Sequence, residues 1–329
     1  MKKLMILGAS TSQLPLIHAA KKAGIYTIAA STPGDWPGFQ AADAFTYTDI
    51  SDGEAVLAEA KRRKIDGIVT CCMDTGVKAI GLVSEAMGLS GPSKTAAETT
   101  TDKYKMKEAF QKNGVSCARH ICIKNEAQLL DALEELPFPG VLKAVDLMGS
   151  RGMFRCDTKE EALQNYRKTM EATGKDYCLV EEFIEGTLFG AEAMLQNGKM
   201  VFCMLDNTES YPGYVPTPVG HSVPFDQENR LGNQAREQVE KAARAVGLDN
   251  CAVNCDLIYK EEKVYVIEIT ARAGATCLPE ITGLCYGVNY YEAIVKLALG
   301  MDVSPMFQKQ APQACSIARS LTSSRDGVV

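Results

Sequence analysis

Two acidic residues near the end of the chain, Asp256 and Glu268, are placed to face each other across a short antiparallel hairpin. The segments 254–259 and 264–270 both alternate in character, and the polar stretch 260–263 forms the turn between them. Directly opposed side chains in a sheet lie roughly 5 Å apart, where like charges destabilise the pairing. A bound cation would compensate for the two charges, and oxygen ligands suit Mg²⁺. The alternative interpretation is a surface hairpin with two solvent-exposed acids.

The register of this hairpin follows from pairing Lys260 with Val264. It predicts one apolar face and one polar face. The apolar face pairs Cys255 with Ile269, Leu257 with Ile267 and Tyr259 with Tyr265, and the polar face pairs Asp256 with Glu268 and Asn254 with Thr270.

Three segments upstream of the hairpin carry residues that suit phosphate chemistry. Lys143 ends an apolar strand and is followed by the glycine loop 146–152. Backbone N–H groups of such a loop, with serine and arginine side chains beside them, can donate to phosphate oxygens. Lys103 opens a helix about forty residues earlier and supplies a second cation, and the apolar strand in 179–186 ends in acids and glycine. Each segment alone is a weak signal.

The first ninety residues alternate apolar strands with helices, which is typical of a parallel sheet covered on both faces. The predicted strands are 4–7, 26–30 and 67–71, and the predicted helices are 14–23, 54–63 and 77–87. Ser10 and Asp74 follow strands of this sheet, at the edge where substrates bind. The turn after the first strand lacks the full glycine fingerprint of a dinucleotide site.

The rest of the chain is predicted to contain a helix from Ser93 to about 113, followed by mixed strands and helices. Asn197-Gly198 is a hairpin turn between two strands, and an apolar stripe marks a helix over 231–246. The segment 206–224, rich in proline, glycine and tyrosine, is predicted to be a functional loop. The remaining predicted elements are strands 118–123, 140–144, 177–183, 191–196 and 200–206 and helices 126–136, 159–173 and 290–299.

Composition limits the class of protein. The chain has 329 residues, 46% of them hydrophobic, and its length favours two or three packed lobes. A net charge of −6 argues against nucleic acid as the main partner, and no apolar stretch approaches the ~18 residues of a membrane span. The 12 cysteines lack C-x-x-C spacing and there are only 3 histidines, so reduced thiols in a cytoplasmic protein are predicted.

Taken in order, the motifs resemble the ATP-grasp superfamily, from about residue 1 to about residue 300. The shared pattern is a helix opening with D-K, a strand ending in K before G-S-x-G, an E-E-F-I-x-G hinge and a D…E-I-x-x-R carboxylate pair. The resemblance implies an α/β fold of three parts. These are an N-terminal Rossmann-like parallel α/β domain (1–93), a linker helix with a small α+β lid (94–178), and a C-terminal α+β domain with an antiparallel sheet and the metal and substrate sites (179–329).

The resemblance also implies ATP and Mg²⁺ as cofactors, with Mn²⁺ as an alternative ion. Asp256 and Glu268 would be the metal ligands, and Arg272 would lie near the transferred phosphoryl group and the substrate carboxylate. The residues implied to bind the nucleotide are the phosphate lysines Lys103 and Lys143, the loop residues Gly149, Ser150, Arg151 and Gly152, the adenine-binding residues Glu181, Glu182, Phe183 and Ile184, and Glu192 on the next strand.

Two positions depart from the family pattern. Leu188 stands where a glutamate usually holds the ribose hydroxyls, so ribose recognition must differ. Thr270 stands where the metal motif E-x-N has asparagine, and we hypothesise that Asn254 or Thr270 supplies the missing oxygen. His221 is a candidate substrate residue with Ser10 and Asp74, although a solvated loop histidine is an equal alternative. Tyr211 and Tyr214 either line the acceptor pocket or pack the loop.

Members of this family usually phosphorylate a carboxylate to an acylphosphate, which an amine then attacks. The predicted activity is therefore an ADP-forming carboxylate–amine ligase acting on small molecules, with a homodimer implied by the family. One alternative is activation of bicarbonate or carbamate, as in carbamoyl-phosphate synthases. A nucleotide-binding regulator without turnover is another, given Leu188 and Thr270. A dehydrogenase is a third, opposed by the incomplete glycine fingerprint.

Overall fold

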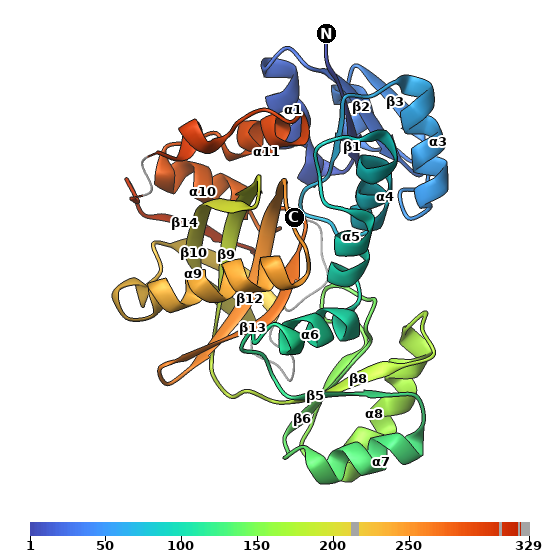
Figure 1. Ribbon diagram of the computed structural model, residues 1–329, viewed down its shortest axis with the longest axis vertical. Coiled ribbons are helices and arrows are strands. Elements are labelled where there is room, and N and C mark those ends of the chain that lie inside the picture. The colour runs from blue at the N-terminus through green and yellow to red at the C-terminus, as the bar shows by residue number, and fades with distance from the viewer. Residues whose placement is uncertain (212–216, 309–310, 322, 324–329) are drawn as a thin grey trace.

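The computed structural model describes residues 1–211, 217–308, 311–321 and 323. It contains three sheets, which Figure 1 shows one above the other: a parallel sheet at the top, a large antiparallel sheet in the middle and a small antiparallel sheet at the bottom. The predicted α/β architecture of three parts is confirmed. The residue boundaries given for those parts stay predictions.

The N-terminal sheet has the strand order β3-β2-β1-β4 and all its strands are parallel. Its strands are apolar because helices cover both faces. On β1, Met5 and Leu7 pack with α3 and α4, whereas Leu4 and Ile6 pack with α1 and α11 from the far end of the chain. The elements are β1 (Lys3–Leu7), η1 (Thr11–Gln13), α1 (Leu14–Lys22), β2 (Tyr26–Ser31), α2 (Pro37–Ala41), β3 (Ala44–Tyr47), α3 (Gly53–Arg63), β4 (Gly67–Val69) and α4 (Val77–Met87).

The linker is two helices, so the single helix predicted from Ser93 to about 113 is wrong. The elements are α5 (Lys94–Thr100) and α6 (Lys103–Lys112). The break occurs because Asp102 is extended, with φ −135° and ψ 107°, and caps α6 by accepting hydrogen bonds from the backbone of Tyr104 and Lys105. This cap places Lys103 at the first position of α6.

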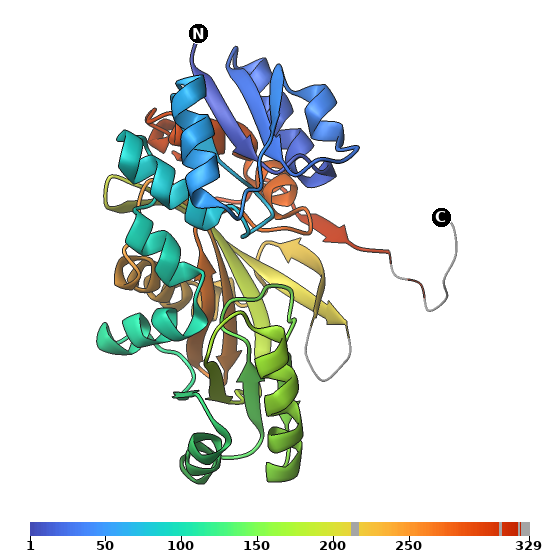
Figure 2. The ribbon, with the colours of Figure 1, turned by 90° about the vertical axis from the view of Figure 1, so that its right-hand side faces the viewer.

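The lid is the four-stranded sheet β5-β8-β6-β7 with two helices packed on it, seen at the bottom of Figure 2 in green. Its elements match the prediction except for β7, a strand after the glycine loop that was not predicted. They are β5 (His120–Ile123), α7 (Glu126–Glu135), β6 (Gly140–Lys143), β7 (Met153–Cys156), α8 (Lys159–Ala172) and β8 (Cys178–Glu182).

The large sheet has the order β13-β12-β9-β10-β11-β14 and is antiparallel throughout. Its face formed by Ala191, Ala193 and their neighbours packs on α9, whose apolar stripe is the predicted one. The elements are β9 (Thr187–Gln196), β10 (Lys199–Tyr211), β11 (Thr217–Val223), α9 (Glu228–Ala245), β12 (Cys251–Lys260), β13 (Lys263–Thr270), α10 (Leu278–Tyr286), α11 (Tyr290–Ala298), η2 (Ser304–Phe307) and β14 (Ser316–Arg319).

The segment 206–224 is largely a strand hairpin, so its prediction as a loop is wrong over most of its length. β10 continues to Tyr211 and pairs with β11, including Thr208 opposite His221. Among the described residues of this segment, Pro218 and Gly220 flank a bulge in the pairing of β11 with β10, so these two residues do not exclude a strand. Tyr214 lies outside the described residues. The predicted turn at 197–198 is confirmed, with positive φ at both positions.

The hairpin of β12 and β13 holds the predicted pairs at its inner end. Asp256 lies opposite Glu268, Asn254 opposite Thr270 and Cys255 opposite Ile269. The outer pairs differ, because the turn has two residues and Lys260 pairs with Lys263. A bulge beside Asp256 absorbs the one-residue difference. The predicted pairs Lys260–Val264, Leu257–Ile267 and Tyr259–Tyr265 are replaced by Lys260–Lys263, Leu257–Val266 and Tyr259–Val264.

Candidate active site

A cavity of about 900 Å³ lies where the three parts of the chain meet. Its walls come from the loop after β4, from α6, from the lid and its glycine loop, and from one face of the large sheet. Most predicted site residues line it: Asp74, Lys103, Lys143, Gly149, Ser150, Arg151, Glu181, Glu182, Phe183, Ile184, His221, Asn254, Asp256, Glu268 and Arg272.

Four predicted site residues do not line the cavity. Ser10 caps the short helix η1 in a capping box with Gln13. Glu192 is fully buried and accepts a hydrogen bond from the backbone of Gly274 at 2.7 Å. Gly152 lies at the base of the glycine loop, where a side chain would meet Ala144. Thr270 is buried and donates its hydroxyl to Asp74 at 2.5 Å.

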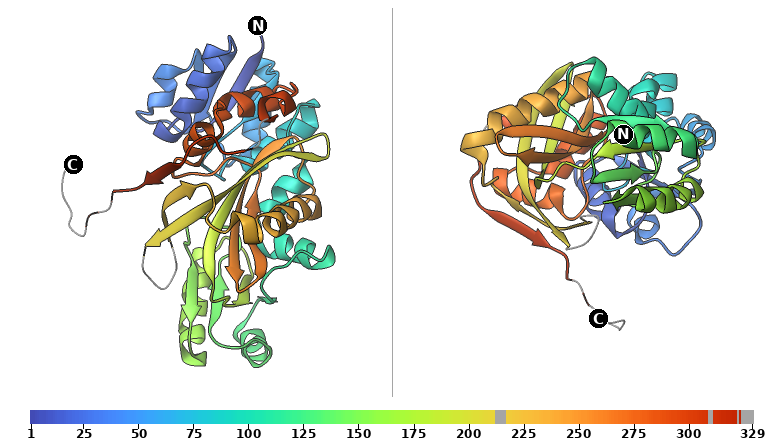
Figure 3. Two further views of the ribbon diagram at one scale, coloured as in Figure 1. Left: turned by 90° about the vertical axis from the view of Figure 1, so that its left-hand side faces the viewer. Right: turned by 90° about the horizontal axis from the view of Figure 1, so that it is seen from below.

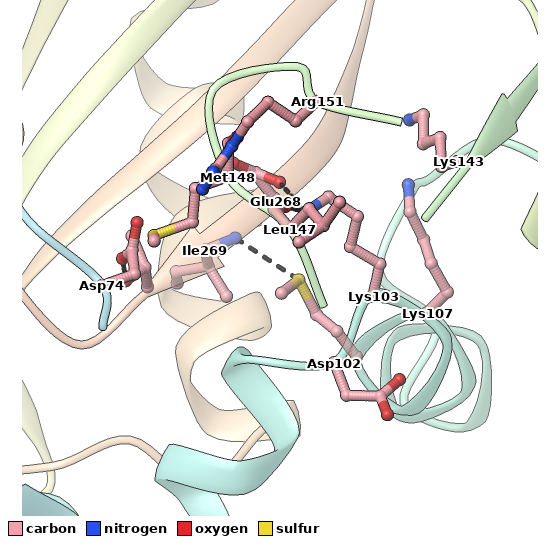
Figure 4. A network of polar contacts seen from close by, with 12 residues as sticks. Asp74, Asp102, Lys103, Lys107, Lys143, Leu147, Met148, Arg151, Glu268 and Ile269 are labelled. Carbon is pink, nitrogen blue, oxygen red and sulfur yellow. Dashed lines mark hydrogen bonds and ion pairs between the residues drawn. The ribbon is translucent and has the colours of Figure 1, made fainter. Parts of the chain in front are cut away.

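Two lysines reach the cavity from successive turns of α6, as Figure 4 shows. Lys103 donates to the carbonyl of Leu147 at 2.7 Å, and its Nζ lies 3.4 Å from Glu268 Oε2. Burial alone would lower the pKa of Lys103, but Glu268 raises it above the ordinary value. Lys107 lies four residues later on the same helical face and is buried. Sequence analysis missed Lys107, although its i+4 spacing from Lys103 was the available signal.

Glu181 lies between two lysines. Its Oε2 is 2.7 Å from Lys143 Nζ and its Oε1 is 3.6 Å from Lys107 Nζ, and all three side chains are almost wholly buried. Burial would raise the pKa of Glu181, but the two ammonium groups hold it at about 2. Burial also lowers the pKa of Lys143, since this effect outweighs the attraction of Glu181. The carboxylate thus fixes two cations at the wall of the cavity.

Asp256 and Glu268 face each other across the hairpin of β12 and β13, and Glu268 lies beside Lys103. Burial and the nearby carboxylate of Glu268 raise the pKa of Asp256 to about 7. A divalent cation would relieve this repulsion, so the pair fits Mg²⁺ in ligand type and charge. Among the described residues, no group of three or more histidine, cysteine or acidic side chains could hold a metal. The ion would therefore need further oxygens, which the phosphates of a bound nucleotide would supply.

Arg272 is held in a two-pronged ion pair with Asp74. Its Nε lies 2.7 Å from Asp74 Oδ1 and a terminal nitrogen lies 2.8 Å from Oδ2, while the other terminal nitrogen donates to Asn254 Oδ1 at 3.1 Å. A backbone bridge between Cys71 and Ala273 brings the two segments together. The oxygens hypothesised to complete the metal site, on Asn254 and Thr270, thus have other partners here, and that hypothesis stays a prediction.

The glycine loop has the left-handed backbone that glycine favours. Gly149, Ser150 and Gly152 have φ of 62°, 59° and 65°, and the first two of these residues line the cavity. Arg151 is exposed and donates to the carbonyl of Met148 at 3.1 Å. Leu188, at the position where family members hold the ribose, lines the cavity as an apolar residue.

One solved structure that the chain resembles in both sequence and fold is the phosphoribosylglycinamide synthetase of Anaerococcus prevotii. Its crystal structure has a TM-score of 0.83 and 41% sequence identity, over 97% of this chain and 80% of that chain. The family described as ATP-grasp domain matches residues 100–276, over half of the chain. The chain belongs to the ATP-grasp family. It is an ATP-dependent ligase, as the resemblance implied.

Two curated relatives have lower sequence identity to this chain. The formate-dependent phosphoribosylglycinamide formyltransferase of Prochlorococcus marinus (strain NATL1A) is 23% identical over 97% of this chain and 82% of its own length. The alanine–anticapsin ligase of Bacillus subtilis (strain 168) is 26% identical over 66% of this chain and 51% of its own length. Within the described residues, none of the helices combines the length and apolar character that crossing a membrane requires.

The proposed metal site makes a pH prediction. Because the metal-free carboxyl of Asp256 has a pKa of about 7, a proton competes with Mg²⁺ below that pH. We expect the affinity for Mg²⁺ to fall about tenfold between pH 8 and pH 6. Calorimetric titration of Mg²⁺ with a non-hydrolysable ATP analogue measures this. An Asp256→Asn variant in the same buffers reports the contribution of the nucleotide itself, and equal pH dependence in both proteins would contradict the assignment.

Proposed function

We propose that the chain phosphorylates a small carboxylate with ATP and couples it to an amine, giving an amide, ADP and phosphate. The observation that carries the proposal is the 3.4 Å ion pair between Lys103 and Glu268. This ion pair places an ammonium group that could bind the triphosphate directly beside a carboxylate that could bind Mg²⁺. Phosphoryl transfer needs this adjacency, since catalysis rests on positioning and charge neutralisation.

Each group in the cavity has a role in this proposal. Lys103, Lys107 and Lys143 would bind phosphate oxygens, and the glycine loop would cover them. Asp256 and Glu268 would hold Mg²⁺, which neutralises charge on the phosphates when bound. The adenine role of Glu181 depends on its carboxylate remaining accessible beside the two lysines that it now contacts.

Arg272 is the proposed anchor for the carboxylate that is phosphorylated. A guanidinium binds carboxylates through two parallel hydrogen bonds, and Asp74 makes that contact here. The carboxylate of Asp74 therefore stands in for a substrate acid. A bound acid would displace Asp74 or bind beside it, so Asp74 helps to decide which acid enters.

Relatives suggest which substrates to try first. The Anaerococcus protein is named for making phosphoribosylglycinamide, and the Prochlorococcus protein for transferring a formyl group to it with formate. The Bacillus protein is named for joining alanine to anticapsin. All three names fit an acid joined to an amine. We infer that glycine, formate and alanine are the first acids to test, with phosphoribosylamine-type and amino acid amines.

The test is ADP release in the presence of Mg²⁺ over pairs of acids and amines. We expect release to require both partners, and the amide to appear by mass spectrometry in equal amount. Chelation of Mg²⁺ should stop the reaction, whereas Asp131→Asn, which changes an exposed acid on α7, should leave it unchanged. ADP release with bicarbonate and ammonia alone would refute an amide-forming ligase, as would no release with any pair.

A further inference from the structure

A buried histidine–aspartate pair lies on β10 and β11 at the wall of the cavity. His221 Nδ1 is 2.7 Å from Asp206 Oδ1, and Thr208 donates to the same oxygen at 3.1 Å. Asp206 is fully buried and His221 is 7% exposed. Burying a carboxylate costs free energy unless its partners compensate. Asp206 Oδ2 nonetheless has no hydrogen-bond partner among the described residues, so packing alone does not explain this pair.

The register of the large sheet builds the pair. His221 lies opposite Thr208, so Asp206, two residues earlier on β10, shares its face and lies diagonal to it. Gly190 lies between Asp206 and Asp256 in the same cross-strand row. A side chain at Gly190 would begin 2.5 Å from Asp206 Oδ2. Glycine at this position therefore leaves room for the Asp206 carboxylate, in line with the proposed metal ligands.

The pairing leaves one nitrogen of His221 for the cavity. His221 lines the cavity, and its Nδ1 is occupied by Asp206. Its Nε2 has no hydrogen-bond partner in the part of the chain that the structure describes, and this atom is not fully buried. An imidazole whose Nδ1–H donates to a carboxylate presents the lone pair of Nε2 as a proton acceptor. The accessible atom of this residue is thus a base.

The other titratable groups of the cavity already have partners or proposed roles. Asp74 pairs with Arg272, and Glu181 pairs with two lysines. Glu182 pairs with Arg119 at 2.8 Å. Asp256 and Glu268 are the proposed metal ligands, and a metal-bound carboxylate is a poor proton acceptor. Among the described residues that line the cavity, His221 is the one imidazole, and a buried carboxylate orients it.

We propose that His221 is the catalytic base for the amine and that Asp206 is its positioning residue. This assignment rests on the proposed function. The amine nitrogen forms the C–N bond to the carbonyl carbon of the acylphosphate, the C–O bond to phosphate breaks, and phosphate leaves with the electron pair. Nε2 of His221 takes the first proton from the protonated amine, which frees the nitrogen lone pair for attack. The second proton leaves nitrogen after the C–N bond forms and departs with the phosphate. The substrate class that this chemistry implies is an amine that is protonated in solution, for which a base is required.

Hydroxylamine separates this step from the steps before it. It is largely unprotonated at neutral pH and attacks acylphosphates without help from a base, giving a hydroxamate. The experiment compares amide and hydroxamate formation with the same acid in the wild type, His221→Gln and Asp206→Asn. We expect both variants to lose amide formation by about 10²-fold or more, while hydroxamate formation changes by less than about threefold. Asp206→Asn keeps the size of the side chain but favours the wrong imidazole tautomer.

Two measurements guard against a merely structural effect. Imidazole added to His221→Gly should restore amide formation, which a repair of folding would not do selectively. His18→Gln, which changes an exposed histidine on α1, should behave as the wild type. The base assignment is overturned if both products fall together or if neither falls. If the wild type forms no hydroxamate with any acid, the proposed function itself fails and this assignment fails with it.

Discussion

Replacing Asp256 with asparagine is expected to abolish turnover and, at the same time, to stabilise the metal-free protein. Activity should fall about 10³-fold or more because a proposed ligand of Mg²⁺ is lost. The folded protein holds the pKa of Asp256 at about 7, well above about 3.9 in an unfolded chain. The native state therefore binds the extra proton, and Asp256 makes the protein less stable as pH rises from about 4 to about 7.

Asparagine removes the cost of burying a charged carboxylate beside Glu268, so the free energy of unfolding at pH 8 should rise by the order of 3 kcal/mol. Urea denaturation at pH 8 without metal measures the gain, and its absence at pH 4 is the internal control. Asp131→Asn on α7 should change neither activity nor stability. A variant that is both inactive and less stable than the wild type at pH 8 would show that the two carboxylates do not oppose each other.

Glu181→Gln is expected to cause the largest loss of stability. The substitution leaves Lys107 and Lys143 buried together without an anion, and removing one member of a buried ionic group typically costs about 3–5 kcal/mol. The pKa of Glu181 is about 2 in the folded protein. Its contribution is therefore present at neutral pH and is lost as pH falls from about 4 towards 2. Chemical denaturation at neutral pH measures the effect.

Nucleotide should reverse much of this loss, since phosphate oxygens would replace the missing carboxylate beside the lysines. The increase in melting temperature on adding MgATP should be larger for Glu181→Gln than for the wild type. Glu182→Gln is the matched stability control, because its partner Arg119 is exposed and surface ion pairs contribute at most about 1 kcal/mol. An equal increase in melting temperature in the wild type and Glu181→Gln on adding MgATP would contradict the proposal that these lysines bind the triphosphate.

Local patterns in the sequence predicted most of the framework. The alternation of apolar strands with helices gave the N-terminal sheet, and the stripe on α9 gave the cover of the large sheet. The pairing of Asp256 with Glu268 was predicted despite two errors, because a shorter turn and a bulge cancel at that position. In the outer half of the same hairpin the prediction is wrong, because Val264 and Val266 enter the core in place of Tyr265 and Ile267.

Contacts between distant segments could not be predicted in this way. Asp74 and Arg272 are 198 residues apart, and their pairing depends on how the loop after β4 meets the end of β13. Asp206 and His221 pair only if 206–224 is a hairpin, which its composition disguised. Glu181 was predicted to bind adenine from its motif alone. Its contacts with Lys107 on α6 and Lys143 on β6 depend on how those elements pack. Sequence motifs predicted most of the residues that line the cavity, and tertiary packing decides which of them contact one another.

The shared packing of α11 against the N-terminal sheet, visible in Figures 1 and 3, limits how this enzyme can be recombined. Leu4 and Ile6 share a core with Tyr290 and Ile294, and the bridge at Ala273 ties the same sheet to Arg272. A chimera that exchanges the first ninety residues alone would have mismatched packing contacts at both places. A chimera that keeps these contacts therefore needs α11 and the strand end around Ala273 from the same parent as the sheet.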